Sequence, residues 1–114
     1  MKNIYSTNET KTNDVWIDGR PIYRKTIPIG VLPNDNSQTF THGISNLGNV
    51  CSIVATWYDT LDNRWFANFR KDSDTIFIAF QVDNINLKVE AKGVNWSART
   101  NNANCTITYT KTTD

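Results

Sequence analysis

The sequence has few of the residues that build helices. Its 114 residues include two Glu, four Leu and six Ala, whereas Asn and Thr occur 15 times each. Asn competes with the helical backbone for hydrogen bonds and Thr crowds it, whereas Thr, Val, Ile and aromatic residues fit a pleated strand. The composition therefore predicts an all-β chain.

Signals for membranes and export are also lacking. No run approaches the roughly 18 apolar residues that cross a bilayer as a helix, and the N-terminal stretch has no apolar signal-peptide core. With 12 basic and 11 acidic residues the net charge is +1, so no overall field attracts nucleic acid or an anionic membrane. We expect one soluble domain, without membrane insertion, that is not secreted by its own signal.

Residues typical of catalytic and metal sites are scarce as well. The single histidine, His42, excludes an all-His metal site, and beside Gly43 it is typical of a turn or an interface. Cys51 and Cys105 favour two buried free thiols, with an inter-strand disulfide or a metal site as alternatives. No nucleotide-binding, hydrolase or metalloprotease motif occurs. The sequence therefore predicts a protein that is not an enzyme and uses no cofactor and no metal.

Short apolar runs alternate regularly with turn residues. This pattern predicts an antiparallel β-sandwich or jelly roll, with a barrel as the alternative. Loops are expected at Pro33–Asn36 and around Lys92-Gly93. The expected strands are Val15–Ile17, Pro21–Ile29, Cys51–Tyr58, Trp65–Phe69, Thr75–Val82, Leu87–Ala91, Val94–Ala98 and Cys105–Thr110.

The pattern within these strands indicates which faces are buried. Leu87–Ala91 and Cys105–Tyr109 alternate apolar with polar residues, as strands with one solvated face do. Ser52–Tyr58 and Ile76–Phe80 are apolar on both faces, which predicts a second covering layer. Another subunit is the expected source of that layer.

Aromatic and polar residues gather in two places. Flat aromatic rings stack on sugar rings, and Asn, Asp and Arg hydrogen-bond their hydroxyls, so both places are candidates for receptor or glycan binding. The alternatives are Trp side chains in the core and turn-capping Asp; paired carboxylates of a glycosidase or a calcium site are disfavoured. The candidates are Tyr58, Asp59, Asp62, Asn63, Arg64, Trp65, Trp96, Asn101 and Asn102.

Three segments carry a resemblance to a known family. Tyr5–Glu9 reads YSTNE, Trp16–Ile27 reads WIDGRPIYRKTI and Tyr109–Asp114 reads YTKTTD. In this order they resemble the C-terminal domain of phage and prophage tail-fibre, baseplate and other virion proteins from viruses of low-GC Gram-positive and other gut bacteria.

The resemblance implies a β-rich tip, made in the bacterial cytoplasm and displayed on the virion as a homotrimer attached to the rest of a fibre protein. Such a tip is expected to recognise a surface glycan or a protein receptor. The alternative is a structural trimerisation cap or capsid decoration without receptor binding. Residues 1–30 are expected to form an inter-subunit arm and hairpin, and residues 31–114 the sandwich body. The interface candidates are Trp16, Ile22, Tyr23 and Arg24.

Overall fold

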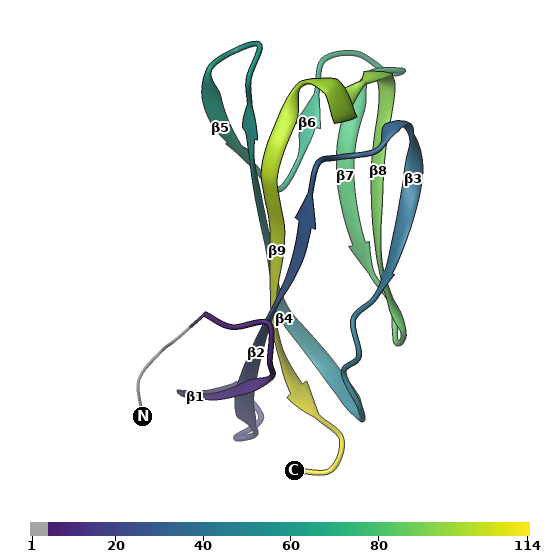
Figure 1. Ribbon diagram of the computed structural model, residues 1–114. Coiled ribbons are helices and arrows are strands. Elements are labelled where there is room, and N and C mark those ends of the chain that lie inside the picture. Colours follow the sequence, from purple (N-terminus) through teal and green to yellow (C-terminus); the bar gives the residue numbers. More distant parts are fainter. Residues whose placement is uncertain (1–4) are drawn as a thin grey trace.

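Two antiparallel sheets pack face to face in the computed structural model, which describes residues 5–114 (Figure 1). The five-stranded sheet has the order β1 (Thr10–Val15), β2 (Pro21–Gly30), β9 (Thr100–Lys111), β4 (Leu47–Asp59) and β5 (Arg64–Ala67). The four-stranded sheet has the order β3 (Asn34–Thr41), β8 (Asn86–Asn95), β7 (Phe77–Val82) and β6 (Arg70–Lys71). The predicted all-β antiparallel sandwich is confirmed.

The core lies between the sheets and is built by alternate residues of the central strands. Leu87, Val89 and Ala91 of β8 are fully buried, and so are Cys105 and Ile107 of β9. The predicted inward faces of these two strands are therefore confirmed. Trp57 of β4 is also fully buried, and it stacks on Phe66 at 6.1 Å between ring centroids.

One end of the molecule is a single sheet. Strands β2, β4 and β9 continue past the four-stranded sheet, and β1, the C-terminus and the first described residues lie at this end (Figure 1). The Asp18-Gly19 turn closes the β1–β2 hairpin, where the Gly19 N–H donates to Trp16 O at 2.9 Å. Pro21 stands at the first position of β2, where a missing N–H is tolerated.

Several predicted boundaries were wrong. Asn34 and Asn36, expected in a loop, belong to β3, because this edge strand pairs with β8 through its backbone while its side chains stay largely polar. Trp16 and Ile17 form a turn rather than a strand. The expected strand Val94–Ala98 divides between the end of β8 and a 3-10 turn, η1 (Trp96–Ala98).

Gly93 lies inside β8 rather than in the predicted turn. Its φ is +97°, and a Cβ at this position would approach Thr75 O and Ile76 Cγ1 to 2.6 Å. The Gly93 N–H also donates to Asp35 Oδ1 at 2.7 Å. Glycine is required here because the backbone has a positive φ and because the loop before β7 leaves no room for a side chain.

The division into an arm and a body also differs from the prediction. Strand β2 is an interior strand that pairs with both β1 and β9, so residues 21–30 are part of the sandwich. On β4 the outward side chain of Val54 is 46% exposed, so one chain does not bury both faces of this strand. A covering layer supplied by another subunit stays a prediction.

Both cysteines are free thiols, as favoured from the sequence. Cys105 is buried, and this burial raises the pKa of its thiol to about 12. Cys51 is only partly buried, in contrast to the prediction. A thiolate is the reactive form, so the buried Cys105 is chemically inert at neutral pH.

Candidate functional site

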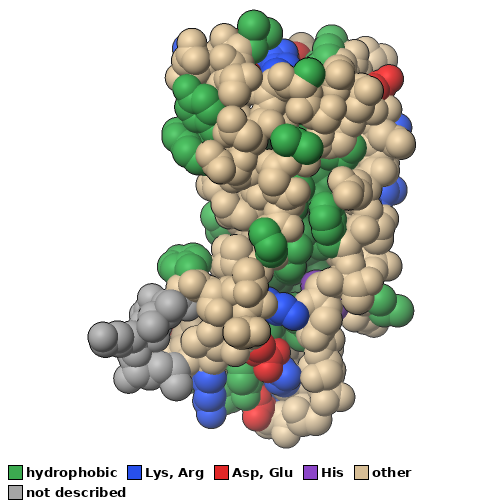
Figure 2. All heavy atoms as spheres, in the orientation of Figure 1, with side chains coloured by type: hydrophobic (Ala, Val, Ile, Leu, Met, Phe, Trp, Pro, Cys, Tyr) green, Lys and Arg blue, Asp and Glu red, His purple; other side chains and the backbone are tan. Residues whose placement is uncertain are grey.

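An aromatic pair stands on the outer face of the five-stranded sheet. Tyr58 of β4 and Trp65 of β5 are cross-strand partners, and their rings meet edge to face with centroids 5.3 Å apart. Trp65 is 59% exposed, and the Tyr58 hydroxyl lies 3.5 Å from Asn63 Oδ1 in the turn between the strands. Figure 2 shows apolar side chains gathered at the edge of the molecule where β5 lies. The indole ring of Trp65 is therefore exposed to solvent and held in a defined orientation by Tyr58.

Strand β9 adds amide groups beside this pair. Asn101 lies opposite Tyr58, and Asn104 lies opposite Thr56. Between them Asn102 adopts a φ of +53° at an irregularity in the ladder, which returns Ala103 to the core. Asn102 Nδ2 donates to Asn101 Oδ1 at 3.2 Å. The candidates Tyr58, Asn63, Trp65, Asn101 and Asn102 thus lie together, and we call them the platform.

The acidic candidates lie on the opposite side of the same strands. Asp59 pairs with Arg64 across the ladder, so both side chains point away from the platform. Asp59 is completely buried, and its Oδ1 accepts the N–H groups of Leu61 and Asp62 at 2.9 and 3.0 Å. The predicted receptor contact through Asp59 is therefore corrected: its carboxylate caps the β4–β5 turn.

Two arginines complete an ion network around this carboxylate. Arg70 and Arg99 donate to Asp59 Oδ2 at 2.9 and 2.8 Å, and both also reach Asp62 Oδ2, at 3.0 and 3.3 Å. Burial by itself would raise the pKa of Asp59, but the hydrogen bonds from the Asp62 N–H and from Arg99 outweigh it and lower the pKa. Asp59 is therefore an anion held by two cations. Asp62 shares both of them, so the two carboxylates form a structural network.

Trp96 belongs to this network and not to the surface. Its ring is fully buried, with the guanidinium carbons of Arg99 and Arg70 at 4.8 and 5.2 Å from its centroid. Its Nε1–H donates to Lys92 O at 2.9 Å. The prediction that Trp96 contacts a receptor is therefore corrected, because η1 folds its ring beneath the two arginines.

The interface candidates make contacts within the chain. Tyr23 stacks on Tyr109 at 6.1 Å, and the guanidinium of Arg24 lies 4.1 Å from the ring centroid of Tyr5. Trp16 and Ile22 are half-buried in the β1–β2 hairpin. These contacts involve one chain, so a subunit interface at these residues stays a prediction.

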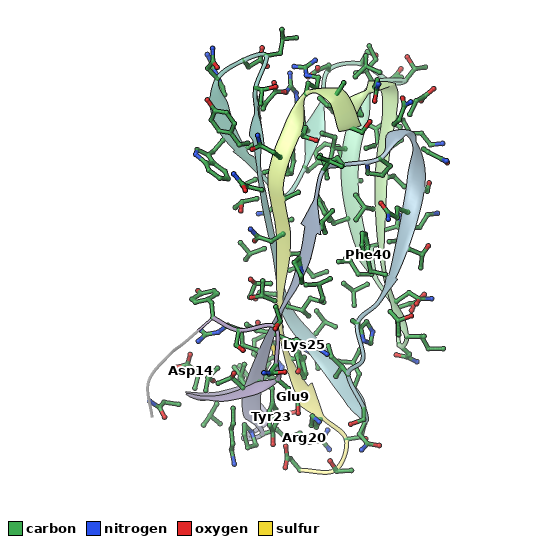
Figure 3. The ribbon with its side chains drawn as sticks, in the orientation of Figure 1. Glu9, Asp14, Arg20, Tyr23, Lys25 and Phe40 are labelled. Atoms are coloured by element: carbon green, nitrogen blue, oxygen red, sulfur yellow. The ribbon has the colours of Figure 1, made fainter. Side chains whose placement is uncertain are left out.

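The three segments that carry the family resemblance meet at the single-sheet end. Glu9 accepts the hydroxyl of Tyr109 at 2.6 Å and pairs with Lys111 at 2.7 Å. Lys111 in turn lies 5.3 Å from the ring centroid of Tyr23. Burial and the neighbouring Glu9 raise the pKa of Tyr109. Figure 3 shows Glu9 and Tyr23 close together at this end, and these tertiary contacts were not predicted from the sequence.

His42 fills a turn, as its position beside Gly43 predicted. It is buried, its Nδ1 accepts the Ile44 N–H at 3.1 Å, and its Nε2 lies 2.8 Å from Asp83 O. These two bonds fix the neutral tautomer with the proton on Nε2. The ring connects the segment after β3 to the β7–β8 turn.

Residues 5–114 contain no group of three or more His, Cys, Asp and Glu side chains that could hold a metal ion, and they form no pocket. No helix in this part of the chain is long and apolar enough to cross a membrane. Comparison with known proteins gave no match: no family model fits the chain, and no curated protein or solved structure is significantly similar to it.

Proposed function

We propose that this chain is a non-enzymatic receptor-binding domain of a phage virion, and that its platform binds a saccharide of the bacterial surface. The observation that carries this proposal is the exposed indole of Trp65, held edge to face by Tyr58 among amide side chains. An aromatic face covers the apolar side of a sugar ring, and neighbouring amides donate to and accept from its hydroxyls.

The platform is suited to binding because it is ordered before a ligand arrives. Trp65 and Tyr58 stand on paired strands, and Asn63 in the turn and Asn102 in β9 both adopt a left-handed backbone conformation with φ of +53°. A ligand that meets fixed groups loses less conformational entropy than one that must order a loop.

The position of the chain ends supports display of this site. The C-terminus and the first described residues lie at the single-sheet end, away from β5 (Figure 1). A virion protein joined at either end would leave the platform facing outward. The resemblance of Tyr5–Glu9, Trp16–Ile27 and Tyr109–Asp114 to virion end domains supplies the phage context of the proposal.

A homotrimer is part of this proposal. Three copies of a weak saccharide site on one tip, and several tips on one virion, give an avidity that a single site lacks. The exposed hairpin tip, where Ile17 is 92% exposed, is an apolar surface that such an assembly could cover.

A structural cap is the second candidate. The observation in its favour is the contact cluster of Glu9, Tyr23, Tyr109 and Lys111, because the resembling segments stabilise each other within one chain. A module that serves only for folding would use these contacts without needing the platform.

Substitution of Trp65 separates the two candidates. We expect Trp65→Ala to weaken binding to cell-wall fractions of low-GC Gram-positive bacteria roughly 30-fold, the loss typical of a central aromatic contact. Ile85→Ala, which shortens a 65% exposed side chain in the β7–β8 turn, is the matched control and should bind normally. Equal binding by wild type and Trp65→Ala would place the binding site outside the platform, and no binding by either protein would favour the structural cap.

A further inference from the structure

The outer faces of the two sheets differ in charge. The four-stranded sheet presents Lys88, Glu90 and Lys92 on successive outward positions of β8, with Lys88 and Glu90 paired at 3.5 Å. Lys71 of β6 lies on the same side, since it pairs with Phe77, the partner of Lys92. This is the usual composition of a solvated face.

Four strands of the five-stranded sheet, β2, β9, β4 and β5, differ from this in the charges on their outer face. Lys25 points inward and donates to His42 O at 2.6 Å, Lys111 pairs with Glu9, and Asp59 and Arg64 lie on the side opposite the platform. Arg24 alone points outward, and it is buried beneath Tyr5. Within the described residues, the outer face of β2, β9, β4 and β5 therefore presents no exposed charged side chain.

This uncharged face continues along the strands from the platform. Below Tyr58 and Trp65, the cross-strand pairs are Thr56 with Asn104, Val54 with Thr106, and Ser52 with Thr108. The hydroxyls of Ser52 and Thr108 are hydrogen-bonded, and Thr106 bonds Thr26 of β2 at 2.9 Å. Six residues of strand separate Tyr58 from Ser52, a span of roughly 20 Å. The face is thus longer than a site for a single sugar.

From this arrangement we infer that the platform is one end of an extended site for a neutral saccharide chain, which lies along β4 and β9 from Trp65 toward Ser52. The inference rests on the proposed function and adds the charge class and the direction of the ligand. An anionic polymer would place its charges over a face without exposed cations, where they would lose hydration without gaining a partner. Hydroxyls and amides, in contrast, both donate and accept, as the hydroxyls of a neutral sugar do.

A second copy of the chain, which the sequence predicted as the covering layer over β4, is disfavoured as the occupant of this face. The core of a stable protein interface is enriched in apolar and aromatic groups, whereas hydroxyl and amide groups dominate here between Val54 and Trp65. Those groups are regularly spaced by the strand repeat, which suits a polymer with a repeating pattern of hydroxyls.

The test is binding of the intact protein to an array that pairs neutral oligosaccharides of increasing length with acidic ones carrying carboxylate or phosphate. We expect affinity for neutral chains to rise with length, and to change less than about twofold when the salt concentration is raised, because no ion pair is screened. Trp65→Ala should weaken binding at every length. Val54→Lys should weaken only the longer oligomers, by about tenfold, since a cation then interrupts the far part of the face.

Thr39→Lys is the matched control, because it adds the same charge to the outer face of the four-stranded sheet and should not affect binding. Preference for acidic oligosaccharides, strong salt dependence, or equal losses at all lengths for Val54→Lys would overturn the inference while leaving saccharide binding in place. Binding of no saccharide would remove the proposed function as well. A solution mass that falls to one chain on Val54→Lys would instead identify the face as a subunit interface.

Discussion

Replacing Asp59 with Asn tests the ion network that underlies the β4–β5 hairpin. The substitution keeps the size of the side chain and the Oδ1 acceptor for the Leu61 and Asp62 N–H groups. It removes the negative charge that faces Arg70 and Arg99, whose side chains are only 14% and 19% exposed. Loss of one partner from a buried ion network costs about 3 kcal/mol in the free energy of unfolding.

For a domain of this size we expect Asp59→Asn to lower Tm by roughly 12 °C, which urea and thermal denaturation would measure. Asp74→Asn is the control, because Asp74 is 94% exposed in its pair with Lys71 and should change stability by less than about 0.5 kcal/mol. A loss below about 1 kcal/mol for Asp59→Asn would refute the reasoning, since the network would then contribute no more than a surface pair.

The same variant has a pH signature. The pKa of Asp59 is lower in the folded protein than its ordinary value of 3.8, so its contribution to stability is complete above that value. This contribution is lost as the pH falls through the pKa that Asp59 has in the folded protein. Wild-type stability should therefore fall more steeply than that of Asp59→Asn as the solution is acidified below about pH 4, and parallel curves for the two proteins would contradict this assignment.

Three further outcomes are expected. Gly93→Ala should lower the free energy of unfolding by about 2 kcal/mol or more, because it combines a positive φ with a contact of 2.6 Å to Thr75 O; an unchanged urea midpoint would show that β8 adapts. His42→Asn, which can still accept the Ile44 N–H, should be more stable than His42→Ala in the same assay, and equal losses would assign no role to that bond. Light scattering should give about 39 kDa, three times the 13.0 kDa of one chain, across a dilution series, and a stable monomer would contradict the proposed trimer.

Much of the fold could be predicted because the central strands alternate clearly. Leu87–Ala91 and Cys105–Tyr109 place an apolar residue at every second position, and the structure buries those residues. Strand β3 was missed because it reads NDNSQTFT and lies at a sheet edge, where backbone pairing with β8 does not require apolar side chains. Gly93 was assigned to a turn because its contact with Thr75 joins β8 to the loop before β7, and no local pattern reveals this contact.

The candidate site was predicted only in part. Sequence proximity grouped Tyr58 with Asp59 and Trp65 with Arg64, although neighbours on a strand point to opposite faces. The alternation of side chains along a strand follows from the sequence, and it would have assigned Asp59 and Arg64 to the face opposite Tyr58 and Trp65. The partners of Asp59 could not be predicted, because Arg70 and Arg99 lie 11 and 40 residues away along the chain. Arg99 reaches Asp59 when β9 pairs with β4, and Arg70 reaches it when the two sheets pack.

The two faces of the β4–β5 hairpin depend on each other. Asp59 fixes the turn and the end of β4 on the inner side, while Tyr58, the preceding residue, orients Trp65 on the outer side. If binding uses a preordered platform, loosening the turn should reduce affinity even when the chain remains folded. We therefore expect Asp59→Asn to bind cell-wall saccharide more weakly than Asp74→Asn at a low temperature where both variants are fully folded. Equal affinities would show that the Tyr58–Trp65 contact orients the ring without the network, and the effect of Asp59 would then be confined to stability.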